Sequence, residues 1–433
     1  MFTSADEVHD LVGVGFGPSN LALAIALRER GEHGSAVFFE RQPAFAWHPG
    51  LLIEGTTMQV SFLKDLATMR NPSSAFSFLN YLQDKGRLAD FINHKTMFPS
   101  RVEFHDYLEW AARRFTDQVH YASEVLAVTP VRAGGTVTAC DVEVRQHVRG
   151  GTPVVRRVRT RNLVVATGLQ PRLPETVTSG PRIWHSSEYL HRVDRLRDPR
   201  RIVVVGAGQS AAEVTDHLHR TFPGAEICAL FSKYGYTPAD DTPFANRIFD
   251  PAAVDDYYGA PDQVKELLHG YHAGTNYSVV DTELIVELYR RAYQEKIHHT
   301  ERLRIMNVSR LVTATGDHDG VTAVIEHLPT GARTELAADA IICATGYHSG
   351  DPRRLLGELA DECLTRPDGR LRIERDYRVA TTGALACGIY VQGATEHTHG
   401  LSSTLLSNVA VRAGEIAQSI AARPAHRLVA AAA

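Results

Sequence analysis

The sequence predicts an α/β fold with two Rossmann-like dinucleotide-binding domains and a small, mostly helical insertion. Two glycine-rich runs carry this prediction, GFGPSN at residues 15–20 and GAGQSA at residues 206–211. Each run lies between a short apolar stretch and a helix-forming one, at 10–14 and 21–30 for the first and at 201–205 and 211–220 for the second. A strand, a glycine turn and a helix in this order form the phosphate-binding unit of a Rossmann fold.

The glycines within each run have different tasks. The first glycine, Gly15 or Gly206, allows a tight turn, and the second, Gly17 or Gly208, lets the backbone approach a pyrophosphate at the following helix N-terminus. The other residues of the two runs that we expect to bind the cofactors are Pro18, Asn20, Gln209 and Ser210. A single run is weak evidence, but two runs in register with their strands predict two nucleotides on one chain.

The ends of the next strands distinguish the two nucleotides. The first such strand, at 35–40, ends on Glu40, whose carboxylate can accept hydrogen bonds from the hydroxyls of a free ribose. The second, at 226–231, is followed by Ser232 and Lys233, which tolerate or attract a 2′-phosphate. Although Glu40 and Lys233 can also be read as solvated surface residues, the two strand ends together favour FAD at the first site and NADPH at the second.

Two further strands end in Ala-Thr-Gly, at 163–168 and at 340–346. A glycine at such an end has no Cβ, so backbone can come close to a flavin or nucleotide. We therefore expect Thr167, Thr345 and Gly346 to bind cofactor; the alternative is an ordinary junction between strand and turn.

These landmarks divide the 433 residues into four pieces. The expected pieces are the first part of an FAD-binding domain at 1–174, an NADPH-binding domain at 175–237 and 294–345, a helical substrate-binding insertion at 238–293, and a completion of the FAD and substrate domain at 346–433. A helix is expected at 401–420 in the last piece.

Composition excludes several other classes of protein. Hydrophobic and charged contents of 44% and 22% are typical of a globular protein, and a net charge of −4 indicates neither a nucleic-acid nor a membrane partner. The five cysteines are widely spaced without a Cys-x-x-Cys pair, so we expect no metal site and no redox dithiol, and a reducing cytoplasm. Acidic residues at Asp6 and Glu7 are unlike the basic start of a signal peptide.

Eight longer motifs complete the pattern. They are MQVSFLKDL at 58–66, RNP at 70–72, FHDY at 104–107, WHSS at 184–187, DDTPFAN at 240–246, TNYS at 275–278, ATGY at 344–347 and HTHGLS at 397–402. With these motifs the chain resembles, over nearly its whole length, the flavin-dependent N-hydroxylating monooxygenases, and within them the L-ornithine N5-monooxygenases of siderophore and related biosynthesis.

The resemblance implies a reaction and its reactants. NADPH would reduce FAD, the reduced flavin would capture O₂ as a C4a-hydroperoxide, and that species would hydroxylate the side-chain amine of L-ornithine. The protein would orient the reactants and exclude water. A homo-oligomer, and within the family a tetramer, is also implied.

The resemblance also assigns roles to individual residues. Lys64 would pair with the substrate α-carboxylate, Asn246 and Asn276 would hold the amino-acid end, and Ser402 would lie near substrate and flavin. Gln59 would guard the hydroperoxide beside the flavin, so Gln59 and Asn276 are the expected catalytic residues. The remaining flavin contacts implied are Trp47, His48 and Leu401.

Departures from the family pattern leave the exact activity open. Ser232 stands where many relatives have an arginine that binds the 2′-phosphate, and Ser403 and Gly274 stand where Asp and Asn are usual. L-Lysine remains an alternative substrate, because one methylene changes binding by only about 1–3 kcal/mol. An NADPH:FAD reductase without amine hydroxylation, a non-catalytic nucleotide sensor, and a Baeyer-Villiger or sulfoxidising enzyme would share the two glycine-rich turns.

Overall fold

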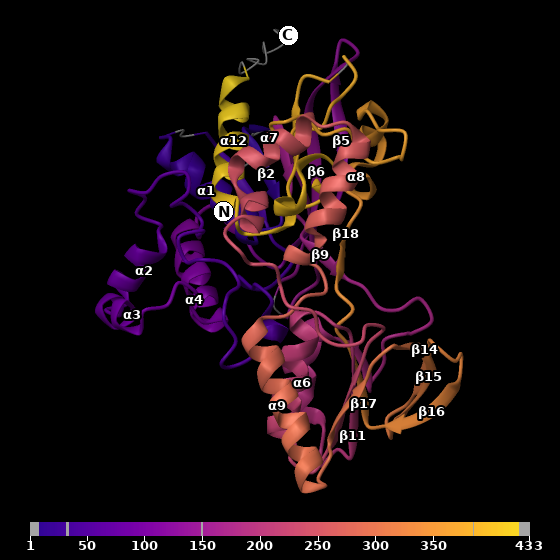
Figure 1. The fold of residues 1–433 in the computed structure, drawn as a ribbon. Coiled ribbons are helices and arrows are strands. Elements are labelled where there is room, and N and C mark those ends of the chain that lie inside the picture. Colours follow the sequence, from indigo (N-terminus) through magenta and orange to yellow (C-terminus); the bar gives the residue numbers. More distant parts are fainter. Residues whose placement is uncertain (1–7, 32–33, 149, 384, 424–433) are drawn as a thin grey trace.

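Two five-stranded parallel sheets organise the chain in this computed structural model, which describes residues 8–31, 34–148, 150–383 and 385–423. Asp6 and Glu7, whose acidity argues against a signal peptide, lie outside the described residues. Figure 1 shows one sheet in the upper part of the molecule with β2, and the other in the lower part with β11 and β17. The predicted class, an α/β protein with two Rossmann-like domains, is confirmed.

The upper sheet joins the two ends of the chain. Its strand order is β19 (Gly388–Val391), β8 (Asn162–Val165), β2 (Leu11–Val14), β3 (Ala36–Phe39) and β4 (Val119–His120). The apolar run of β2 is buried throughout, as expected for a central parallel strand covered on both faces. Helices α1 (Pro18–Glu29) and α12 (Val409–Ala422) pack together in the core on one side of the sheet.

An antiparallel sheet covers the other face of the upper sheet. Its strand order is β1 (Val8–His9), β7 (Val154–Thr160), β6 (Thr136–Gln146) and β5 (Ser123–Ala133), and only the short edge strand β1 pairs in parallel. Side chains of β5 to β7 share a core with those of β2, β3 and β8. An aromatic cluster on the α1 side holds helices α2 (Phe78–Asp84), α3 (Leu88–His94) and α4 (Arg101–Ala112).

The lower sheet has the strand order β10 (Ile183–His185), β17 (Ala340–Cys343), β11 (Arg201–Val205), β12 (Glu226–Leu230) and β13 (Leu303–Met306). Helices α6 (Gln209–Thr221) and α9 (Thr282–His298) share the core on one face. A small antiparallel sheet of β14 (Ser309–Gly316), β15 (Val321–His327) and β16 (Arg333–Ala338) covers the other face.

The segment between β12 and α9 leaves the lower sheet. Its helices α7 (Pro251–Gly259) and α8 (Asp262–His272) lie in the upper part of the molecule, where α7 contacts α11 (Glu396–His399). Helix α9 returns to pack on α6 and leads into β13, so it belongs with the lower sheet. The predicted insertion at 238–293 therefore extends into α9, because helical periodicity does not distinguish an inserted helix from one that covers a sheet.

The predicted helix at 401–420 begins later than expected. A 3-10 helix covers Leu401–Thr404, and α12 starts only at Val409. Ser402, Ser403, Ser407 and Asn408 interrupt the segment, and such side chains compete with helical backbone hydrogen bonds. Thr404, the last residue of the 3-10 helix, and the non-helical residues 405–407 line the cavity between the two parallel sheets.

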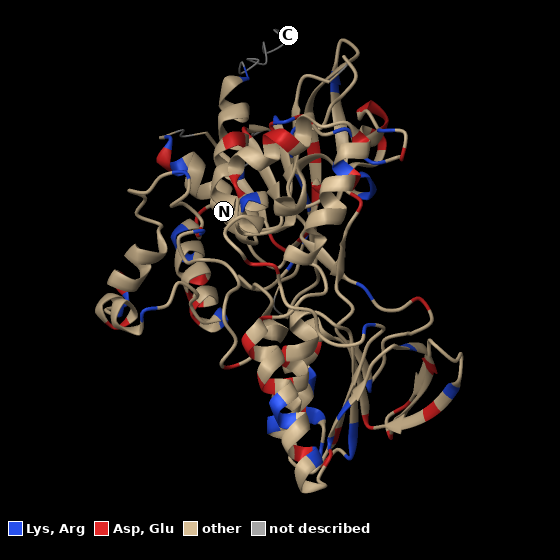
Figure 2. Cartoon of the chain, in the orientation of Figure 1, with Lys and Arg blue, Asp and Glu red and all other residues tan. Residues whose placement is uncertain are grey.

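Figure 2 shows acidic and basic residues interleaved on the lower helices and on the small antiparallel sheet. No helix in the described part of the chain has the length and apolar character needed to cross a bilayer.

Candidate active site

A cavity of about 2360 Å³ lies between the two parallel sheets and is lined by both glycine-rich turns. It is more than twice as large as an ordinary small-molecule site of about 300–1,000 Å³. Its wall contains most of the residues expected from the sequence, namely Gly15, Gly17, Pro18, Glu40, Trp47, His48, Gln59, Lys64, Thr167, Gly206, Gly208, Gln209, Ser210, Lys233, Asn246, Asn276, Thr345 and Gly346. Residues far apart in sequence thus meet in one space.

Three expected contacts lie behind the wall instead. Asn20 is fully buried, and its Nδ2 donates to the carbonyl of Gly15 at 2.7 Å, so it shapes the first glycine turn from inside. Leu401 and Ser402 are each 2% exposed, and the cavity is lined by the following residues, from Thr404 to Ser407. Asn20 is therefore buried within the first glycine turn, and Leu401 and Ser402 are buried within the 401–404 turn, so direct cofactor or substrate contacts from these three side chains stay predictions.

The first glycine turn has the shape that a dinucleotide needs. Gly15 has φ +83°, and a Cβ there would lie 2.5 Å from the carbonyl oxygen of Ala166, whereas a Cβ on Gly17 would meet no atom within 4 Å. Gly17 therefore leaves open space at the start of α1, whose N-cap has no side-chain hydrogen bond. Unpaired helix N–H groups beside open space suit a pyrophosphate.

Glu40 completes this end of the cavity. Its carboxylate accepts hydrogen bonds from the backbone N–H groups of Phe16 at 2.7 Å and Gln42 at 2.8 Å. These bonds fix the carboxylate at the end of β3, where the ribose hydroxyls of a bound adenosine are recognised in Rossmann units. The residues present thus fit FAD.

The second glycine turn repeats the first. A Cβ on Gly206, with φ +140°, would lie 2.3 Å from the carbonyl oxygen of Ala344, so each first glycine abuts the strand that ends in Ala-Thr-Gly. Helix α6 likewise begins at Gly208 without a side-chain cap. This repetition means that the second site fits a dinucleotide by the same geometry.

Lys233 is only partly available to a ligand. Its Nζ donates to the carbonyl oxygen of Ser278 at 2.7 Å and lies 3.4 Å from Oγ1 of Thr237. Lys233 therefore ties the end of β12 to the loop that carries Asn276, although it also lines the cavity.

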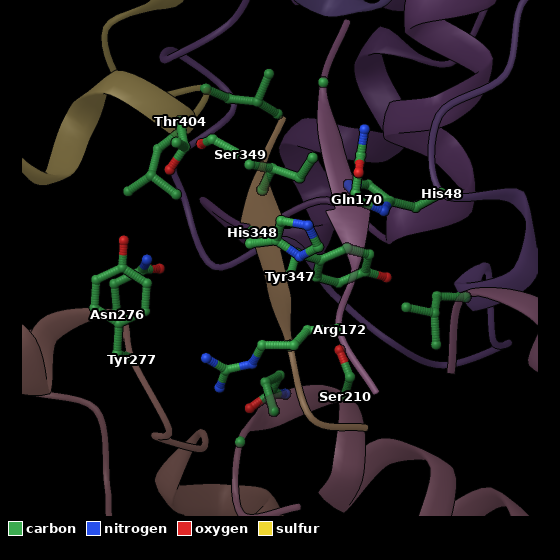
Figure 3. A pocket seen from close by; sticks show the side chains of 18 of the residues that line it. His48, Gln170, Arg172, Ser210, Asn276, Tyr277, Tyr347, His348, Ser349 and Thr404 are labelled. Atoms are coloured by element: carbon green, nitrogen blue, oxygen red, sulfur yellow. The ribbon is translucent and has the colours of Figure 1, made fainter. Parts of the chain in front are cut away.

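Aromatic and imidazole rings form the wall between the two turns. The ring centroid of Tyr347 lies 6.0 Å from that of His48 (Figure 3). It lies 4.9 Å from that of His185, and the ring centroid of Trp47 lies 5.1 Å from that of His48. Burial, with a contribution from the positive charge of Arg101, lowers the pKa of His48 to about 4. His48 is therefore neutral at physiological pH and adds no charge to this wall.

Lys64 is a half-buried cation of the cavity wall. Its Nζ lies 5.8 Å from the centre of the Phe249 ring, which belongs to the segment between β12 and α9. Burial lowers the pKa of Lys64, while the carboxylate of Asp250 raises it. An ammonium in this setting gains from an anionic partner that replaces lost water.

Two asparagines face the same space from that segment. Nδ2 of Asn246 donates to the carbonyl of Asp241 at 2.7 Å, which fixes the orientation of its amide. Asn276 ends a 3-10 helix (Ala273–Thr275) and projects with Tyr277 toward the hollow in Figure 3. An ammonium and two amides that line the same cavity form a polar set able to bind an amino acid.

Sequence reasoning missed a polar network that connects the two domains. Nε2 of Gln59 donates to Asp281 at 3.0 Å, and Nε2 of Gln209 donates to the other carboxylate oxygen of Asp281 at 2.8 Å and to Glu213 at 3.0 Å. Glu213 in turn accepts two hydrogen bonds of 2.8 Å from the guanidinium of Arg101. No sequence motif marks these pairings, since the partners are 222 and 112 residues apart.

Arg412 was also missed. This residue of α12 is 2% exposed, lines the cavity, and donates from Nη1 to the carbonyl of Ser403 at 2.9 Å. It therefore holds the 3-10 helix at 401–404 and places a buried positive charge beside the FAD end of the cavity. A lone arginine in a helical pattern gives no sequence signal for such a position.

The histidines in and near the HTHGLS motif bond to carbonyl groups. Nε2 of His397 contacts the carbonyl of Leu371 at 2.9 Å, and Nε2 of His399 contacts that of Arg375 at 3.2 Å. Within the described ranges, no three His, Cys, Asp or Glu residues gather as a metal site.

Comparison with known proteins identifies close similarities. The model of the L-lysine 6-monooxygenase/L-ornithine 5-monooxygenase family matches residues 7–349. An L-ornithine N(5)-monooxygenase of Burkholderia cepacia is 42% identical over 91% of this chain and 90% of its own length, and one of Pseudomonas aeruginosa is 40% identical over 96% and 95%. The solved structure of an ornithine N-hydroxylase from Kutzneria sp. 744, with reduced FAD, NADP⁺ and L-ornithine, superposes with a TM-score of 0.92 at 47% identity, covering 96% of this chain and 99% of that one.

Proposed function

The chain belongs to the L-lysine 6-monooxygenase/L-ornithine 5-monooxygenase family, and we propose that it is an FAD- and NADPH-dependent L-ornithine N5-monooxygenase. The product is N5-hydroxy-L-ornithine, for siderophore or related natural-product biosynthesis. One observation carries the proposal: Lys64, Asn246 and Asn276 line the same cavity as both dinucleotide-binding turns.

Different residues bind the two cofactors. FAD is held by the first turn with Glu40, Thr167 and the Trp47–His48 pair, and NADPH by the second turn with Thr345 and Gly346. The chemistry that bound FAD would supply is hydride acceptance from NADPH and activation of O₂, of which one oxygen atom would go to the amine and the other would leave as water. All other contributions come from the positions and charges of the protein's own residues.

The charges along the wall orient the substrate. Lys64 binds the α-carboxylate of L-ornithine, and the amides of Asn246 and Asn276 bind its amino-acid end, so the side-chain amine extends away from Lys64. Lys64 disfavours diamines, which have no carboxylate to pair with. The amine nitrogen must be unprotonated to accept oxygen, so its end of the site needs hydrogen-bond acceptors rather than a carboxylate, which would stabilise the ammonium form.

Gln59 lies at the boundary between the two nucleotide sites. Its amide is held by Asp281, the same residue that binds Gln209 at the start of α6. We assign Gln59 and Asn276 to the reaction centre as the groups that position the reactants and limit the access of water. Leu401 and Ser402 contribute through the backbone of their turn.

The proposed residue roles also define the domain boundaries. We propose that residues 1–174 and 346–433 form the FAD domain, that 175–237 and 294–345 belong to the NADPH domain together with α9, and that the rest of 238–293 binds substrate. We also propose a cytoplasmic location, because the five cysteines are buried and form no disulfide.

A homo-oligomer, a tetramer by resemblance, is also part of the proposal. Helix α9 exposes an apolar stripe of Val286, Tyr289, Tyr293 and Ile297, with exposed fractions of 60%, 75%, 59% and 55%. Light scattering of the purified protein and of a Tyr289→Glu variant tests this: a monomeric wild type would contradict it.

A comparison of two substrates tests the proposed activity. The FAD-loaded protein is incubated with NADPH in air and with L-ornithine or L-lysine, and the hydroxylated amine is identified by mass spectrometry. We expect kcat/KM for L-ornithine to exceed that for L-lysine by roughly 10- to 200-fold, the usual effect of one methylene. A preference for L-lysine would make the chain a lysine N6-monooxygenase, and oxidation of NADPH without hydroxylated amine would indicate an NADPH:FAD reductase.

A further inference from the structure

We propose that Arg310 is the residue that selects NADPH over NADH in this chain, by binding the 2′-phosphate of the nucleotide. The inference deepens the proposed function, since it assumes that the second site takes NADPH, but it requires no amine substrate. Two observations lead to it. Ser232 is uncharged where a cation is expected to bind the 2′-phosphate, and the start of β14 lies beside the end of β12.

The place of the 2′-phosphate follows from topology. In a Rossmann unit, the residues after the second strand face the ribose of the adenosine. Here that strand is β12, and Ser232 follows it in the cavity wall. A serine hydroxyl can accept or donate a hydrogen bond, but it brings no charge to a phosphate dianion.

The adjacent cation is already engaged. Lys233 donates from Nζ to the carbonyl of Ser278, which directs its ammonium toward the 275–278 loop. If the ammonium of Lys233 also binds a phosphate, it must do so while it donates to the carbonyl of Ser278. The strand end needs another source of positive charge to prefer NADPH.

Strand β14 supplies one. The N–H of Ser309 donates to the carbonyl of Phe231 at 3.0 Å, and the N–H of Val308 donates to the carbonyl of Lys233 at 2.9 Å. These bonds hold the start of β14 against the residues on either side of Ser232. Arg310 follows directly and lines the same cavity.

The ion pairs around Arg310 leave excess positive charge. Nη2 of Arg310 donates to Oε1 of Glu326 at 2.7 Å, while Nε of Arg333 donates to Oε2 of the same carboxylate at 3.1 Å. Hydrogen bonds from Arg333 and Arg310 lower the pKa of Glu326, so this carboxylate is ionised at neutral pH. One carboxylate thus pairs with two guanidiniums, and the three side chains of Arg310, Arg333 and Glu326 together have a net charge of about +1.

Glu326 also orients the guanidinium of Arg310. A guanidinium has five N–H donors in a rigid planar fork, so fixing one nitrogen leaves donors on its other edge for a second partner. The Arg310 side chain is 60% exposed, which leaves that edge accessible to a ligand entering the cavity. Planar donors of this kind match the oxygens of a phosphate.

Binding measurements test the proposal without any turnover. NADP⁺ and NAD⁺ are titrated into the FAD-loaded protein by calorimetry, and 2′-phospho-AMP and AMP serve as probes of the adenosine end alone. We expect Arg310→Gln to weaken binding of NADP⁺ and 2′-phospho-AMP by roughly 10- to 100-fold, the usual effect of losing a charge-assisted hydrogen bond, and to leave NAD⁺ and AMP unchanged. Arg310→Lys should restore part of the loss.

Arg333→Gln is the matched control, because Arg333 shares Glu326 but lies outside the cavity wall. It should leave the ratio of NADP⁺ to NAD⁺ affinity unchanged. FAD content and the melting temperature of each variant establish that the exposed substitutions leave the fold intact.

Three results would overturn the proposal. The first is an unchanged affinity ratio in Arg310→Gln, and the second is an equal change in Arg333→Gln, which would mean that both act by stabilising the small sheet. The third is a changed ratio in Arg172→Gln instead, since Arg172 also lines the cavity (Figure 3). Hydroxylated ornithine is not the readout, so failure of the proposed amine chemistry is distinguishable from failure of this assignment.

Discussion

Replacing Lys64 by methionine tests the orientation of the substrate. Methionine preserves much of the length of the side chain and removes its charge. We expect KM for L-ornithine to rise by roughly 10- to 150-fold, while the rate at which NADPH reduces the flavin stays within about twofold of the wild type. KM and the rate of flavin reduction should respond differently, because Lys64 lines the cavity with Asn246 and Asn276, whereas NADPH binds at the second glycine turn.

The magnitude follows from the surroundings of Lys64. The side chain is half-buried and its pKa is lowered by burial, so the empty site already contains a partly desolvated ammonium. A carboxylate that binds there regains a charge-assisted hydrogen bond, which contributes about 1.5–3 kcal/mol. Each 1.4 kcal/mol corresponds to about tenfold in binding, and this gives the range stated above.

Putrescine provides the sharper assay, because it has the two amines without the carboxylate. The ratio of kcat/KM for L-ornithine to that for putrescine should be large in the wild type and should collapse in Lys64→Met, with putrescine itself little changed. Lys265→Met is the control, because burial also lowers the pKa of Lys265 but that residue packs by the rings of Tyr257 and Tyr258 outside the cavity wall. An unchanged ratio in Lys64→Met, or an equal fall in flavin reduction, would refute the carboxylate role.

Three other substitutions test the remaining parts of the account. Gly17→Ala should leave the melting temperature of the apoprotein unchanged but reduce the FAD content of the purified protein, because the added Cβ meets no protein atom and occupies the space for the pyrophosphate; full FAD content would contradict this. Glu213→Gln should lower the free energy of unfolding by about 3–5 kcal/mol in urea titrations, because it leaves the largely buried guanidinium of Arg101 without its anionic partner. The exposed Glu109→Gln serves as its control, and equal effects would refute the role of burial. Burial lowers the pKa of His399 to about 3, so the unfolded chain binds a proton that the folded chain excludes, and the contribution of His399 to stability should be constant above pH 6.5 and fall as pH decreases from 6.5 toward 3. His399→Gln should flatten that fall in urea titrations across this range, and an unaltered slope would contradict the assignment.

The sequence predicted those parts of the site that depend on local backbone. Gly15 and Gly206 were identifiable because a strand, a tight turn and a helix are encoded within about twenty residues, and both indeed abut the Ala-Thr-Gly strands. The side chain of Glu40 was predictable for the same reason, since it ends the strand after the turn.

The parts that sequence reasoning missed depend on contacts across the chain. Asp281 joins Gln59 to Gln209, and nothing near position 281 indicates which distant amides its carboxylate will bind. Ser402 was expected in the wall because the motif containing it is flavin-adjacent in the family, but the 401–404 turn directs the hydroxyl inward and exposes Thr404 instead. Arg310 was not considered, because only the pairing of β14 with the end of β12 brings it beside Ser232.

In the proposed activity, NADPH oxidation by this protein is coupled to hydroxylation of an amino acid. The most direct measurement follows NADPH consumption by the FAD-loaded enzyme in air with L-ornithine, while hydroxylamine product and hydrogen peroxide are quantified in the same sample. We expect nearly one hydroxylated ornithine for each NADPH consumed and little peroxide. Peroxide in amounts equal to NADPH, with no hydroxylated amine from L-ornithine, L-lysine or putrescine, would contradict it.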